Sequence, residues 1–166
     1  MFPPMRRARQ ALPPEECGDI LRWGSCGVLA LAGQDDYPYA LPISYVWDGG
    51  DQLYFHCAKT GHKLDAIARN PRASFCVVGQ DIVAPLEYTT HYRSVIAFGR
   101  MTLVEDTVEK HSALELLGLK YAPMDSAQHR AAYIEKDWDG VQVLKLTIEH
   151  LTGKECVELT LQRNQH

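Results

Sequence analysis

Short apolar runs bounded by turn-forming residues dominate the middle of the chain, and this pattern predicts β-strands. The run at residues 37–47 is rich in aromatic and β-branched residues, and Asp48-Gly49-Gly50-Asp51 then predicts a hairpin turn. Near the end of the chain, residues 141–148 alternate between apolar and polar positions. The predicted strands are residues 26–31, 37–47, 53–57, 73–78, 94–104 and 141–148.

Helical signals occur near the start, in the middle and late in the chain. Pro13-Pro14-Glu15-Glu16 predicts a helix start, since acidic residues favour a first turn, and Gly24 ends that helix. Further helices are expected from about residue 62 to Asn70-Pro71, over residues 106–121 and over residues 128–136. Many short strands with helices between them favour a mainly β fold, a closed antiparallel β-barrel with peripheral helices.

Length and composition bound the remaining possibilities. The chain has 166 residues, which suits one domain over residues 1–166, with an N-terminal arm at 1–14 and a C-terminal tail at 155–166. Its net charge of −4 argues against nucleic-acid and anionic-membrane partners, because both select for clustered positive charge. The five cysteines are odd in number and widely spaced, which favours reduced thiols and a cytoplasmic location.

The stretch from residue 53 to residue 71 carries most of the candidate chemistry. A strand ends near Cys57, a polar loop with a glycine follows, and a helix starts near Gly61. Such a helix start offers unpaired N–H groups to a phosphate, and Lys59, His62 and Lys63 add charge and donors there. Taken alone, the residues favour a plain strand–loop–helix connection with solvated lysines over a phosphate site.

Several sequence blocks, taken in order, resemble one known family. They are Met5-Arg6-Arg7 with Gln10 and Leu12; Gly27-Val28-Leu29-Ala30; Tyr37-Pro38-Tyr39 with Pro42 and Tyr45-Val46; Tyr54-Phe55-His56 through Gly61-His62-Lys63 to Asn70-Pro71; Tyr92-Arg93-Ser94-Val95-Ile96 with Phe98-Gly99; and Ile148-Glu149-His150-Leu151-Thr152-Gly153-Lys154. Together they cover nearly the whole chain and resemble the nitroimidazole-resistance branch of the pyridoxamine 5′-phosphate oxidase-like flavoproteins.

This resemblance implies an antiparallel split β-barrel, a homodimer, and flavin mononucleotide (FMN) at the subunit interface. It implies that residues after the third strand hold the phosphate, that one strand runs beneath the isoalloxazine ring, and that another ends beside it. Carried over to this chain, His62 and Lys63 match the phosphate positions, and Gly61 is a further candidate cofactor residue before them. The strand beneath the ring includes Tyr39, Pro42, Ile43, Ser44 and Tyr45; the strand end beside the ring is His56 and Cys57, and Ala58 starts the loop. Two more candidate cofactor residues, Tyr92 and Ser94, lie at a strand start in a polar run, where Tyr92 either covers the substrate side of the flavin from the partner subunit or packs.

Three of these residues have alternative interpretations. His56 is the candidate catalytic residue, because an imidazole titrates near neutrality and can donate to the flavin or to a substrate. The alternative, less favoured given the resemblance, is a strand-end histidine bonded to a backbone carbonyl. Cys57 is either a redox thiol or a quiet strand cysteine, and the latter is favoured. The spacing of His56, Cys57 and His62 does not favour a metal site.

The function implied by the resemblance is an FMN-dependent oxidoreductase that passes electrons from a reduced donor to a small-molecule acceptor. In the nitroimidazole-resistance branch the suggested acceptor is a nitro-aromatic compound such as a 5-nitroimidazole. The chain has no counterpart of the C-terminal Arg-Leu-x-Pro block of true pyridoxamine 5′-phosphate oxidases, so pyridoxamine phosphate is not the expected substrate. Two alternatives are a non-catalytic flavin-binding or redox-sensing module, and a haem-binding split barrel with His56, His62 or His150 as axial ligand.

Overall fold

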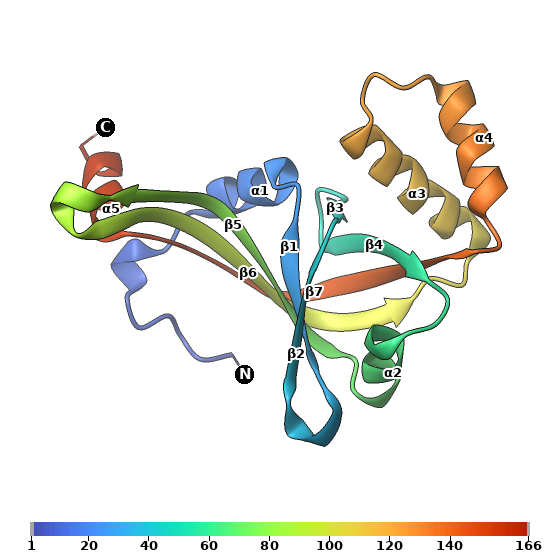
Figure 1. Ribbon diagram of the computed structural model, residues 1–166. Helices are drawn as coiled ribbons and strands as arrows, with labels where there is room; N and C mark the ends of the chain where they lie inside the picture. The colour runs from blue at the N-terminus through green and yellow to red at the C-terminus, as the bar shows by residue number, and fades with distance from the viewer. Residues whose placement is uncertain (1, 166) are drawn as a thin grey trace.

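Seven strands form one antiparallel sheet in the computed structural model, which describes residues 2–165 (Figure 1). Their order across the sheet is β2-β1-β5-β6-β7-β4-β3. The strands are β1 (Gly27–Ala32), β2 (Pro38–Ile43), β3 (Val46–Trp47), β4 (Gln52–Ala58), β5 (Arg72–Ala84), β6 (Thr89–Leu103) and β7 (Val141–Glu155). The mainly β, antiparallel fold class is therefore confirmed.

The expected closed barrel is wrong in one respect, because the hydrogen-bonded sheet is open. Its two edge strands, β2 and β3, are consecutive in the chain and are separated only by Ser44 and Tyr45. The single strand predicted over residues 37–47 thus pairs with β1 in its first half and with β4 in its second half. Between them, the backbone N–H of Tyr45 donates to the Tyr121 hydroxyl (2.8 Å) and not to a strand. This break explains how Pro42 is tolerated so close to the strand end.

The helices begin and end close to the residues that the sequence predicts. Asp106 caps α3 by accepting from the Glu109 N–H (2.7 Å), and Ser126 caps α4 by accepting from the His129 N–H (3.1 Å). Within residues 2–165 none of the helices is both long and apolar enough to cross a membrane. The helices are α1 (Pro14–Trp23), α2 (His62–Arg69), α3 (Thr107–Tyr121), α4 (Ala127–Asp137) and α5 (Val157–Arg163), with 3₁₀ turns η1 (Ala8–Gln10), η2 (Gln34–Asp36) and η3 (Pro85–Glu87).

Strands β5, β6 and β7 are longer than the sequence pattern predicts, and they extend past the rest of the sheet toward α5 (Figure 1). The predicted C-terminal tail contains α5. Glu155, which is fully buried, anchors this end by ion pairs with Arg93 (3.1 Å) and Arg163 (3.0 Å). Arg163 also donates to the Ala11 carbonyl (3.1 Å), so the N-terminal arm and α5 are held together.

Two clusters of buried apolar side chains stabilise the sheet and its contact with α3. The larger cluster fills the inner face of the curved sheet, where Phe75 contacts Tyr45 and Phe55 edge-on. The smaller cluster lies under α3 and includes Tyr54 and Leu117. The Tyr54 hydroxyl donates to Glu109 of α3 (2.8 Å), and Lys145 of β7 donates to the same carboxylate (2.6 Å). Helix α3 is thereby fixed against β4 and β7.

Candidate functional site

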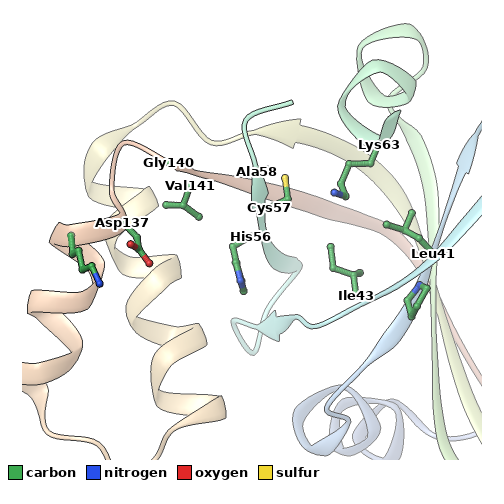
Figure 2. Close-up of a pocket in the computed structure, with 11 residues that line it drawn as sticks. Leu41, Ile43, His56, Cys57, Ala58, Lys63, Asp137, Gly140 and Val141 are labelled. Atoms are coloured by element: carbon green, nitrogen blue, oxygen red, sulfur yellow. The ribbon is translucent and has the colours of Figure 1, made fainter. Parts of the chain in front are cut away.

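A cavity of about 670 Å³ opens where β4 ends, and it is formed by five parts of the chain. Because β4 and β7 are antiparallel, the last residue of β4 (Ala58) pairs with the first residue of β7 (Val141). The edge strand β2, the start of α2 and the connection between α4 and β7 form the other walls. The lining residues are Leu41, Pro42, Ile43, His56, Cys57, Ala58, Lys63, Lys136, Asp137, Gly140 and Val141 (Figure 2).

The start of α2 gives one side of the cavity an anion-binding character. Its N-cap residue is Gly61, which has φ of +137° and offers no side chain to bond the first N–H groups of the helix. Free N–H groups at a helix start attract anions. Lys63 is in the first turn, half-buried, and lines the cavity. A phosphate at this position would meet both the Lys63 ammonium and the helix dipole.

His56 lies between this cavity and a second one of about 440 Å³. Side chains alternate along β4, so Tyr54 and His56 face outward toward α3 whereas Phe55 is in the core. Figure 2 shows Lys63 on one side of the first cavity and Asp137 on the other, with His56 between them. The His56 imidazole is therefore placed to contact ligands in both cavities.

Cys57 points to the opposite side of β4 from His56, where it packs against the larger apolar cluster. Burial raises the pKa of the Cys57 thiol, and the nearby Lys63 ammonium offsets this only in part. The thiol is therefore protonated at neutral pH, and a protonated thiol is a poor nucleophile. This favours a quiet strand cysteine over a redox thiol.

Of the other predicted cofactor residues on β2, β4 and the break after β2, some line a cavity and one lies in the core. Pro42, Ile43 and Ala58 line the first cavity, and Ser44 lines the second. Tyr45 is fully buried in the core, and its hydroxyl donates to the Leu21 carbonyl (2.8 Å).

His62 and Lys63 are neighbours in sequence but lie at different cavities. Successive residues on a helix are about 100° apart, so His62 turns away from Lys63. It lines a third cavity of about 640 Å³, together with Tyr39, Asp65 and Arg69. Lys63 alone of this pair lines the first cavity.

Tyr92 and Ser94 lie outside the three cavities described so far. They are on β6, where Ser94 pairs with Lys154 of β7 and Tyr92 pairs with Asp81 of β5. The Lys154 ammonium lies 5.5 Å from the centre of the Tyr92 ring. Within one chain, neither residue is part of the candidate site.

Sequence reasoning missed one wall of the first cavity, the connection between α4 and β7. Lys136, Asp137, Gly140 and Val141 line the cavity there. The signal was present as the turn-forming run Asp137-Trp138-Asp139-Gly140 directly before the last predicted strand. It could be placed at the site only by knowing that β7 pairs with β4.

Candidate ligands for metals and haem are dispersed. Among residues 2–165, no cluster of three or more His, Cys, Asp or Glu side chains could hold a metal ion. Of the three histidines considered for haem, His56 lines the first two cavities and His62 the third. His150 stacks on Phe2, with ring centres 4.8 Å apart.

The amino-acid sequence matches one known protein family over most of its length. The family described as pyridoxamine 5′-phosphate oxidase matches residues 13–155, which include every element from α1 to β7 in full. The chain belongs to this family. No curated protein matches the chain.

Several solved structures share the fold of this chain. One, from Bacteroides thetaiotaomicron, is provisionally described as a 5-nitroimidazole antibiotic resistance protein; it has a TM-score of 0.74 and 20% identity, over 87% of this chain and 86% of that one. A conserved hypothetical protein from Mycobacterium tuberculosis has a TM-score of 0.78 and 18% identity, over 94% and 92%. An FAD- and haem-binding protein from Mycobacterium smegmatis has a TM-score of 0.71 and 22% identity, over 93% and 80%. This pyridoxamine 5′-phosphate oxidase family member therefore has the split-barrel fold that its sequence blocks implied.

Proposed function

We propose that the chain is a flavin-dependent oxidoreductase that holds FMN in the first cavity. The observation that carries the proposal is the composition of that cavity, which combines apolar residues with Lys63 on one side and with Lys136 and Asp137 on the other. Leu41, Ile43 and Val141 suit the flat face of a flavin ring. Lys63 and the uncapped start of α2 suit a terminal phosphate. The volume of about 670 Å³ is within the usual range for a cofactor pocket.

The residues of the chain would divide the work as follows. The flavin supplies the redox chemistry, by taking electrons from a reduced donor and giving them to an acceptor. Lys63 holds the phosphate, and β2 supports the ring through Pro42 and Ile43. His56 lies where a proton can pass between its imidazole and a ligand in either cavity. The 5-nitroimidazole resistance protein that shares this fold supports a nitro-aromatic acceptor.

The same proposal includes a homodimer. The hairpin formed by β5 and β6 extends away from the cavities and carries strongly exposed apolar side chains, among them Val83, Leu86 and Tyr88. Leu86 is 96% exposed and Tyr88 is 97% exposed, which is costly unless another surface covers them. A two-fold partner would cover this hairpin and would let Tyr92 contribute to the other subunit's site. Light scattering should give twice the chain mass, and a monomer that retains flavin would contradict the dimer.

An absorption spectrum of the purified protein tests the cofactor directly. The expected result is a yellow protein that releases FMN on denaturation, identified by mass. Release of FAD would correct the cofactor but keep the flavin site. A haem spectrum would favour the alternative in which a histidine such as His56 is the axial ligand. Failure to bind any flavin on reconstitution would overturn the proposal.

Turnover separates an oxidoreductase from a non-catalytic flavin-binding module. The purified holoprotein should oxidise NADH or NADPH when a 5-nitroimidazole is supplied. A protein that binds FMN at one equivalent but turns over neither donor with any nitro-aromatic acceptor would support the redox-sensing alternative.

A further inference from the structure

The second cavity lies between α3 and α4 and has apolar walls. Its volume is about 440 Å³, and its apolar lining comes from both helices and from β7. Gly118 on α3 allows this arrangement, since a Cβ atom there would clash with the aliphatic part of Arg130 on α4. The apolar lining residues are Leu114, Leu117, Ala122, Tyr133, Ile134 and Val141.

Most of the charged groups at the cavity have a bonding partner, and Asp137, which both cavities share, adds a negative charge that disfavours an anionic ligand. Asp125 bonds His129 (2.9 Å), and Arg130 donates to Glu115 (2.7 Å). The Tyr121 hydroxyl is also occupied, since it lies 2.6 Å from the Ser25 carbonyl and 2.8 Å from the Tyr45 N–H. A charged ligand would have to break one of these pairs, whereas a neutral ligand would not.

Three polar side chains line the second cavity on the side where it meets the first. His56 and Asp137 line both cavities, and Ser44, at the break between β2 and β3, lines the second. A molecule in the second cavity can therefore reach the first cavity only at His56 and its neighbours Asp137 and Val141, which are the residues common to both.

We propose that the second cavity is the acceptor site and that it selects a neutral, mostly apolar aromatic molecule, with its reducible polar end directed at Ser44 and His56. This inference rests on the proposed function, because it takes the first cavity as the flavin site. The reducible end would enter next to the flavin, while the apolar body remains between α3 and α4. The size of the cavity allows a fused two-ring compound as well as a single ring.

Binding measured separately from turnover tests the site. The probe is 6-nitroquinoline, a neutral two-ring nitro compound, and 4-nitrobenzoate is its charged counterpart. Calorimetric titration of the holoprotein should show binding of 6-nitroquinoline and at least tenfold weaker binding of 4-nitrobenzoate. Because the walls are protein, flavin-free protein should also bind 6-nitroquinoline. No binding to either form of the wild-type protein, or tighter binding of the charged probe, would overturn the inference.

Substitutions on α4 locate the ligand. Ile134→Trp fills the cavity and should weaken 6-nitroquinoline binding at least tenfold, with flavin content unchanged. Gln128→Trp is the matched control, since Gln128 is exposed on the same helix and does not line the cavity; it should change neither quantity. Ala122→Phe fills the cavity from the end of α3 and provides a second test if Ile134→Trp folds poorly.

The outcomes separate this inference from the proposed function. Full 6-nitroquinoline affinity in both filled variants would refute the acceptor site while leaving the flavin site intact. A wild-type protein that binds 6-nitroquinoline in this cavity but takes up no flavin would refute the proposed function, and with it the assignment of the ligand as an electron acceptor.

Discussion

The charged side chain of Lys120, near the end of α3, should lower the free energy of unfolding at neutral pH compared with an uncharged side chain of similar size. Its ammonium lies 3.8 Å above the centre of the Tyr45 ring, is buried, and has no hydrogen-bond partner among residues 2–165. Burial lowers the pKa of Lys120 to about 8, from an ordinary value of 10.5. Since one pKa unit is about 1.4 kcal/mol, keeping the charge buried costs roughly 3 kcal/mol. The cation–π contact returns about 0.5–2 kcal/mol of this.

The sign of the pH dependence follows from the lowered pKa. Above pH 8 the folded protein has released the Lys120 proton while the unfolded chain still holds it, so this residue adds stability as the pH rises from about 8 to 10.5. Lys120→Met removes the charge but keeps most of the packing volume. The variant should be more stable than the wild type at pH 7 by about 1–3 kcal/mol, and the difference should shrink as the pH approaches 10.5.

Urea denaturation of the wild type and the variant, at several pH values between 7 and 10.5, measures this difference. Lys59→Met is the control, because Lys59 is exposed in the loop before α2. Burial also raises the pKa of Tyr45, but this group is present in all three proteins, and the comparison cancels most of its effect. A Lys120→Met protein that is less stable at pH 7, with an unchanged pH profile, would refute the reasoning.

Three other predictions concern the site and its support. Lys63→Ala should weaken FMN binding tenfold to a hundredfold, about 1.5–3 kcal/mol, and leave riboflavin binding nearly unchanged. Lys59→Ala should leave the binding of both flavins nearly unchanged. Equal losses of FMN and riboflavin affinity for Lys63→Ala in a fluorescence titration would show that Lys63 does not hold the phosphate. His56→Ala should keep FMN at one equivalent but slow reoxidation of the reduced flavin in stopped-flow measurements; loss of FMN would place His56 at the wrong end of the cofactor. Glu155→Gln should lower the free energy of unfolding by roughly 1–3 kcal/mol, and an unchanged urea midpoint would show that its ion pairs contribute little.

Local signals in the sequence are sufficient for much of this fold. The end of α1 at Gly24, the turn from Asp48 to Asp51 and the caps Asp106 and Ser126 each act within a few residues of themselves, so their effect can be deduced without knowing the tertiary structure. The position of the cavity beside the loop after His56 was also predictable, because a strand end followed by a glycine and a helix start is a local pattern.

Features that depend on distant partners could not be deduced in this way. The strand predicted over residues 37–47 breaks at Ser44-Tyr45 because its neighbours change from β1 to β4, and Tyr121 of α3 bonds the exposed N–H at the break. The added length of β5, β6 and β7 comes from pairing with one another, which no single strand reveals. Only the fold brings Arg163 to Glu155, so the sequence predicted a C-terminal tail over residues 155–166 and not the helix α5.

The α3–α4 pair explains why the candidate cofactor site was easier to predict than the candidate acceptor site. Both helices lie in the connection between β6 and β7, and together they form most of the second cavity, whereas only the end of α4 lines the first. The strand end at His56 and the start of α2 depend on the barrel itself, which the Tyr54–Glu109 bond and the β4–β7 register hold in place. Substitutions on the cavity side of α4 therefore alter the proposed acceptor site without moving Lys63. If acceptor choice and flavin binding can be changed independently in this protein, His56 is the side chain that takes part in both, because it lines both cavities.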